Sequence, residues 1–360
     1  MSFHEILIAV MAGFAVLGAV DRIAGNRAGL GKEFEEGILA MGSLALAMVG
    51  IVSLAPVLAG LLRPVIVPVY GFLGADPAMF AGTILASDMG GGALAAQMTE
   101  DPRAALLGGV ITGSMLGATV VFTIPVAMGI LSEEDRPAMA KGILCGIVTI
   151  PVGVLVGGLT AGFPTAMVLR NLVPIGVIAA LIALGLWLAE GAMVKGFAVF
   201  GKVVVAVVTV GLAAAIVESL TGLTLIPGMA PISEGFETVG AIAIVLAGAF
   251  PLVAVVTKVL RRPLMAVGKW LGINEPAAAG LIASLANSIA TFGLVKDMNY
   301  RGKVVNIAFA VSAAFVFGDH LGFAAGFAPE MIGPMILGKL AGGVSAVAVA
   351  LWLTKGEEKS

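Results

Sequence analysis

Long apolar segments recur along almost the whole chain, and they constrain its fold more than any other feature. A helix needs about 20 consecutive apolar residues to cross the hydrocarbon core of a bilayer. The composition agrees, because 59% of the 360 residues are hydrophobic and only 12% are charged, whereas soluble domains carry about 25% charged residues. The segments of sufficient length are residues 5–24, 38–62, 104–131, 138–161, 166–190, 196–220, 236–260, 303–327 and 331–354. These segments predict an all-α polytopic membrane protein that is embedded in a lipid bilayer.

The remaining composition excludes several classes of protein. A net charge of −2 gives no reason to expect a nucleic-acid partner. Cys145 is the only cysteine, so neither an internal disulfide nor a cysteine-based metal site is expected. No glycine-rich nucleotide-binding motif, H-E-x-x-H or G-x-S-x-G is present. We therefore expect no cofactor, no bound metal, no ATP-driven pump and no enzyme, whereas a homo-oligomer is compatible with the sequence.

Two further regions, residues 64–97 and 263–295, are apolar but interrupted. Each is expected to start with a short piece after a proline, Pro64 or Pro263, and to break at a turn that contains glycine and proline. Pieces of about twelve residues are too short to cross a bilayer alone. Each region is therefore predicted to be either a re-entrant hairpin or a short helix paired with a longer one.

These two regions also reveal an internal repeat. Three pairs of residues are separated by the same 199 positions, namely Pro64 with Pro263, Pro77 with Pro276, and Asp88 with Asn287. The order of the apolar segments repeats as well, which predicts a first repeat over residues 1–165, a connecting transmembrane helix over 166–190 and a second repeat over 191–360.

The loop charges predict how the chain crosses the membrane, because Lys and Arg collect on the cytoplasmic side. The loop 220–235 has neither residue and is placed outside, whereas the basic residues placed inside include Lys258, Arg261, Arg262, Lys355 and Lys359. Counting the crossings puts the N-terminus outside and the C-terminus inside. The segments 38–62 and 236–260 then run in opposite directions, so the two repeats are predicted to be inverted, with broken helices near the midplane. This arrangement is typical of secondary transporters.

Asp88 is the first candidate for binding a solute. It follows Ser87 and precedes three glycines, Gly90 to Gly92, in a segment at membrane depth. A carboxylate there costs several kcal/mol unless it is paired or hydrated, and glycines allow a ligand to approach the backbone. A cation or a proton would suit such a site, although an aspartate that caps a helix terminus is the structural alternative.

Three polar residues of the second half are the next candidates. Asn287 is the repeat mate of Asp88 and could hydrogen-bond an amine or a hydroxyl, or simply another helix. Asp319 and His320 lie side by side in the apolar segment 303–327, where they could bind a cation, relay a proton or fix helix packing. Glu35 opens the segment 38–62, where an acidic residue complements the helix dipole and could alternatively serve as a gate.

Several of these motifs resemble one known family, and the resemblance runs through nearly the whole chain. The strings that carry it include Phe34-Glu-Glu-Gly37, Met79-Phe-Ala-Gly-Thr-Ile-Leu-Ala-Ser-Asp-Met-Gly-Gly91 and Gly318-Asp-His-Leu-Gly-Phe-Ala-Ala325. They resemble the ethanolamine permease (EutH) family of bacterial ethanolamine utilisation. The resemblance implies import of ethanolamine across the bacterial cytoplasmic membrane. The substrate-binding candidates are the residues selected above from the sequence, namely Asp88, Asn287, Ser87, Asp319, His320 and Glu35.

Two other functions compete with a transporter. A passive channel for small amines could use the same broken helices. An intramembrane aspartyl protease would need the carboxyl groups of Asp88 and Asp319 within hydrogen-bonding distance, and the flanking motifs of such proteases are missing. The separation of these two carboxyl groups therefore distinguishes the protease from the transporter.

Overall fold

The regular elements that the computed structural model describes, within residues 3–356, are all helical. Seven helical stretches of this part are long and apolar enough to cross a membrane. The α-helices are α1 Phe3–Ile23, α2 Leu30–Phe72, α3 Ala78–Ile84, α4 Gly91–Met98, α5 Pro102–Leu106, α6 Ile124–Ile130, α7 Arg136–Ile147, α8 Ile150–Thr160, α9 Thr165–Thr221, α10 Ile232–Leu271, α11 Glu275–Ala286, α12 Ser288–Leu294, α13 Tyr300–Ala313, α14 Asp319–Phe327 and α15 Ile332–Leu353. The side chains of residues 3, 260–262, 264 and 269 lie outside the description, and so do residues 357–360. Three basic residues used to predict the orientation, Arg261, Arg262 and Lys359, therefore lie outside the described part.

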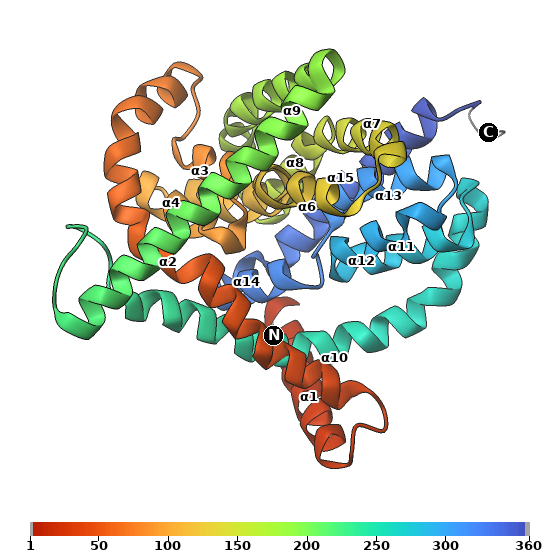
Figure 1. Ribbon diagram of the computed structural model, residues 1–360, viewed down its shortest axis with the longest axis horizontal. Coiled ribbons are helices and arrows are strands. Elements are labelled where there is room, and N and C mark those ends of the chain that lie inside the picture. Colours follow the sequence, from red (N-terminus) through yellow and green to blue (C-terminus); the bar gives the residue numbers. More distant parts are fainter. Residues whose placement is uncertain (1–2, 357–360) are drawn as a thin grey trace.

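Two very long helices, α2 and α10, organise the bundle. They contain 43 and 40 residues, which at a rise of 1.5 Å per residue makes each about 60 Å long, roughly twice the hydrocarbon thickness of a bilayer. Figure 1 shows both as bent rods that cross low in the view. The end of α2 rises on the left beside α3 and α4, and the end of α10 rises on the right beside α11 and α12.

The prediction that a separate short piece starts after Pro64 and after Pro263 is wrong. Both prolines lie inside continuous helices. A proline removes one helical hydrogen bond and bends a helix, but neighbouring groups in a membrane protein can satisfy the freed carbonyl and let the helix continue. The predicted turns are present, between α2 and α3 and between α10 and α11, and each region has a further interruption, between α3 and α4 or between α11 and α12.

Two segments that the sequence predicts as continuous spans are irregular. The segment 303–327 divides into α13 and α14 at residues 314–318, which corrects the prediction of a single helix. The segment 104–131 remains helical, but residues 107–117 and 119–123 adopt the wider π-helical turn. A π-helical turn is rare and frequently marks a functional site.

The order of elements in the first part of the chain recurs in the second. Helices α1 and α2, the broken pair α3/α4, the π-helical span and α7/α8 correspond to the end of α9, α10, the pair α11/α12, the pair α13/α14 and α15. Helix α9 has a non-helical residue at Ala189 and consists of two helices joined at a kink. The relative direction of the two halves across a membrane stays a prediction.

Glycines allow the helices to approach closely in the interior. Gly153 of α8 and Gly338 of α15 face one another, and a Cβ atom added to either would lie within 3 Å of the other residue's carbonyl oxygen. Close contact of this kind stabilises helix pairs in lipid, where no hydrophobic effect drives them together. Large apolar side chains such as Leu39 and Trp187 remain 67% and 75% exposed on the outside, as expected of a surface that faces lipid.

Candidate functional site

The first helix break positions Asp88. Helix α3 ends at Ile84, Leu85 and Ala86 are extended, and a short 3₁₀ turn over Ser87–Met89 leads to Gly90. Gly90 has a positive φ of 92°, a conformation that glycine adopts without steric cost, and α4 starts after it. The chain therefore presents Asp88 on an irregular turn between two short helices.

The second break, at residues 314–318, positions Asp319 and His320 at the start of α14. The backbone N–H groups of Phe315 and Phe317 donate to the carbonyl oxygens of Ser284 and Leu285 at 3.1 and 2.9 Å. These carbonyls belong to the last turn of α11, where a helix leaves its own acceptors unsatisfied. Phe315 has a φ of 62°, a strained conformation that an aromatic residue rarely adopts outside functional sites. The break is thus held in place by α11.

The two breaks meet at one cavity of about 190 Å³, to which Asp88, Asp319 and His320 all contribute. The Nε2 atom of His320 lies 3.6 Å from the Oδ1 atom of Asp88. His320 is 3% exposed, and the other nitrogen of its ring, Nδ1, has no hydrogen-bond partner among the described residues. An unpartnered ring nitrogen at a cavity can accept or donate a hydrogen bond to a ligand.

Aromatic rings close the apolar side of the same cavity. The ring of Phe315 lies 5.3 Å from the imidazole of His320 and 5.4 Å from the ring of Phe122, measured between centroids. Both phenylalanines line the cavity. The cavity therefore has an acidic, hydrogen-bonding side and an apolar side, which is the usual composition of a site for a small molecule.

Lys339 is a charged residue of this region that the sequence analysis did not single out. It is 1% exposed in α15, and its ammonium group donates to the carbonyl oxygen of Ser114 in the π-helical segment. It also lies within electrostatic range of Asp88 and His320. A lysine inside an apolar span, directly after Gly338, is the sequence signal that could have identified it, because buried charges in membranes are costly.

Acidic groups outnumber basic groups at the cavity. Asp88 and Asp319 line it, and Lys339 lies within electrostatic range of Asp88. The polar atom that the structure places beside the Asp88 carboxylate is Nε2 of His320, at 3.6 Å. This excess of acidic groups over basic groups suits a cationic ligand.

The other three predicted residues lie elsewhere. The Oδ1 atom of Asn287 accepts a hydrogen bond from the N–H of Ile289 at 2.7 Å and caps α12. Ser87 is fully buried and lines a neighbouring cavity. Glu35 forms an exposed ion pair with Arg22 at 3.1 Å and does not line the acidic cavity. The described residues contain no cluster of three His, Cys, Asp or Glu side chains suited to a metal ion.

Membrane-length apolar helices that enclose a small acidic cavity at two helix breaks define a multi-pass membrane transport protein. A family model described as "Ethanolamine utilisation protein, EutH" matches residues 3–353. The chain belongs to the EutH family.

Curated relatives match over nearly their entire length. The chain is 62% identical over 353 residues to the "Probable ethanolamine permease EutH" of Listeria monocytogenes, covering 98% of this chain and 95% of the relative. It is 52% identical to the "Uncharacterized protein YxeR" of Bacillus subtilis, covering 99% and 96%. It is 48% identical to the "Probable ethanolamine permease EutH" of Escherichia coli, covering 99% and 97%. No solved structure matches the chain.

Proposed function

We propose that this protein is a secondary transporter that imports ethanolamine across the bacterial cytoplasmic membrane by alternating access. The observation that carries the proposal is the meeting of Asp88, Asp319 and His320 from two helix breaks at one small cavity. Membership of the EutH family, in which relatives bear the name of ethanolamine permease, points to the solute.

The cavity offers groups that suit both ends of ethanolamine. A primary amine of this kind titrates near ~10, as lysine does, so the solute is a cation at neutral pH. In the proposed complex, Asp88 is the principal counter-charge for the ammonium group and Asp319 adds to the negative field. The unpartnered Nδ1 atom of His320 serves the hydroxyl group, and the rings of Phe122 and Phe315 cover the two carbons.

Alternating access is proposed from the repeated architecture. Two five-element units separated by the first part of α9 have the same order of long helix, broken pair and distorted span. The broken pairs lie on opposite sides of the bundle in Figure 1, and the equivalent helices α2 and α10 pack against each other. An inverted relation between the halves would let one rock against the other around a fixed site. The N-terminus is proposed to lie outside and the C-terminus inside.

Radiolabelled ethanolamine uptake into proteoliposomes containing the purified protein tests this function. We expect saturable uptake and accelerated exchange when unlabelled ethanolamine is loaded inside, because a carrier returns faster when it is occupied. Imposing Na⁺, H⁺ and voltage gradients one at a time would identify any coupling. Uptake without saturation or exchange would indicate a channel, and absence of ethanolamine uptake by the wild-type protein would overturn the proposal.

A further inference from the structure

A second cavity lies on the other side of the first helix break. Its volume is about 210 Å³, many times the roughly 10–15 Å³ that one water molecule requires. The two cavities share the turn Ser87–Gly90 as their partition, because Asp88 lines the first cavity and the preceding Ser87 lines the second. We call the second one the outer cavity, since the connection between α9 and α10, which is predicted to lie outside, contributes Ala230 to its wall.

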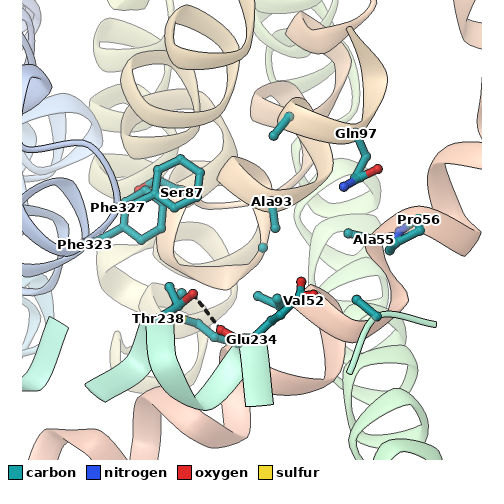
Figure 2. Close-up of a pocket in the computed structure, with 14 residues that line it drawn as sticks. Val52, Ala55, Pro56, Ser87, Ala93, Gln97, Glu234, Thr238, Phe323 and Phe327 are labelled. Carbon is teal, nitrogen blue, oxygen red and sulfur yellow. Dashed lines mark hydrogen bonds between the residues drawn. The ribbon is translucent and has the colours of Figure 1, made fainter. Parts of the chain in front are cut away.

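The outer cavity contains one carboxylate. Glu234 is in the first turn of α10, and Figure 2 shows Glu234 and Thr238 on one wall with Ser87 across the cavity from them. The hydroxyl of Thr238 donates to the backbone carbonyl of Glu234 at 2.9 Å. This hydrogen bond therefore does not involve the Glu234 carboxylate. Within residues 3–356, no ion pair or hydrogen bond engages that carboxylate. A cation that enters the outer cavity would therefore meet an uncompensated negative charge.

An aromatic pair forms another wall. The rings of Phe323 and Phe327 are stacked with their centroids 4.9 Å apart and an interplanar angle of 18°. They approach the backbone of α4 because Gly92 has no side chain, and a Cβ atom there would lie 2.6 Å from Phe323. The face of an aromatic ring attracts an ammonium group, so this wall adds to the attraction of Glu234.

Ser87 supplies the remaining polar group. It is 0% exposed, and its hydroxyl oxygen has no hydrogen-bond partner among the described residues although it lines the outer cavity. A buried hydroxyl without a partner is costly, and a ligand with its own hydroxyl would satisfy it. Pro56 of α2 has no N–H, so the carbonyl oxygen of Val52, also on the cavity wall, loses its helical donor and offers a further acceptor.

We propose that the outer cavity is a second binding site for the same small ammonium alcohol, occupied before the solute reaches Asp88. The ammonium group lies between Glu234 and the stacked phenylalanines, and the hydroxyl group reaches Ser87. This proposal rests on the proposed function for the identity of the solute. The partially exposed carboxylate makes it the weaker of the two sites, because ion pairs in contact with water contribute roughly 0.2–1 kcal/mol.

Ethanolamine binding to the purified protein, measured by calorimetry, separates the two sites. The Asp88→Asn variant should lose the tighter event and keep a weaker one. In the Asp88→Asn background, adding Glu234→Gln should weaken the remaining event by roughly threefold to fivefold. The matched control is Glu237→Gln, which removes an exposed charge one turn along α10 that does not line the outer cavity, and it should change neither event.

A labelling experiment locates the weaker event directly. The only native cysteine, Cys145, is buried, so an Ala93→Cys variant introduces a thiol at the outer cavity wall with little background. In the Asp88→Asn background, ethanolamine should slow the reaction of that thiol with a methanethiosulfonate reagent that carries an ammonium group. A concentration dependence equal to that of the calorimetric event would place the solute in the outer cavity.

The outcomes distinguish this inference from the proposed function. If wild-type protein binds and transports ethanolamine but Asp88→Asn protein shows neither residual binding nor thiol protection, the second site does not exist and the function stands. Residual binding that is unchanged by Glu234→Gln also overturns the second site. If wild-type protein neither binds nor transports ethanolamine, the proposed function itself fails, whatever the thiol reagent reports.

Discussion

The two broken pairs, α3/α4 and α11/α12, which the predicted repeat makes equivalent, place their central polar residues differently. Asp88 in the first pair lines the acidic cavity, with its carboxylate 3.6 Å from His320. Its repeat mate, Asn287, accepts from the N–H of Ile289 and caps α12. Equivalent positions therefore serve two purposes, since one carries charge to the cavity and the other stabilises a helix terminus.

The second half contributes its charge from a different element. The end of α11 holds the break at residues 314–318 through Ser284 and Leu285, and that break carries Asp319 and His320 to the cavity. In the first half, the end of α3 approaches the π-helical segment closely, because Gly117 has no side chain and lies against the carbonyl of Leu85. The π-helical segment itself stays helical. The pair α3/α4 thus carries a charged residue, Asp88, to the cavity, whereas α11 supports the neighbouring break that carries Asp319 and His320.

The largest expected effect separates Asp88 from its repeat mate. Removing one member of a buried charge pair typically costs 3–5 kcal/mol, and each 1.4 kcal/mol is about tenfold in affinity. The Asp88→Asn variant should therefore bind ethanolamine at the acidic cavity roughly a hundredfold more weakly. Calorimetry on purified protein measures this change, and near-wild-type affinity would shift the main counter-charge to Asp319.

A smaller effect tests how the second break is held. A Cβ atom at Gly318 would lie 2.2 Å from the backbone oxygen of Ala286, so Gly318→Ala must push the break away from α11. Overpacking of this kind costs about 1–3 kcal/mol, and we expect a lower thermal midpoint together with weakened ethanolamine binding. Gly176→Ala is the control, because a Cβ there meets nothing within 4 Å. Equal thermal midpoints for the two variants would show that the contact with α11 is unimportant.

Lys339 offers a third test. Among the described residues, it is the cationic side chain that acts electrostatically on Asp88. The Lys339→Met variant makes the site more negative, so ethanolamine should bind more tightly, by roughly tenfold at an effective dielectric near 20. The exposed Lys195 on α9 provides the Lys195→Met control. Unchanged affinity in both variants would remove Lys339 from the charge balance of the site.

The sequence predicted the class and the turns near residues 74–77 and 272–276, because apolar length and Gly-Pro positions are local signals. It did not predict the breaks at Asp88, at Asn287 and at residues 314–318. The presence of a proline does not determine whether a helix bends or ends, so the continuation of α2 through Pro64 could not be predicted. That outcome depends on tertiary contacts that satisfy the backbone.

The acidic cavity was only partly predictable for a related reason. An ionisable residue in an apolar segment can be recognised from the sequence, because it is costly in lipid. Asp88, Asp319 and His320 were selected on that basis. The repeat then suggested Asn287 as the partner of Asp88. That suggestion was unreliable, because symmetry relates backbone positions and does not determine side-chain direction. Lys339 met the same criterion of cost in lipid but was not selected, because basic residues were considered only as signals of orientation.

The smallest expected effect concerns Asn287, and it tests whether repeat symmetry extends to function. An N-cap replaced by alanine typically costs about 1 kcal/mol of stability. Because the side chain of Asn287 bonds the N–H of Ile289 and does not line the acidic cavity, Asn287→Ala should lower the thermal midpoint slightly and leave ethanolamine affinity within about twofold, less than 1.4 kcal/mol. Thermal unfolding and calorimetry on the same preparation measure both quantities. If affinity falls as far as in Asp88→Asn while the thermal midpoint is unchanged, Asn287 binds the solute, and the two broken pairs are functionally equivalent after all.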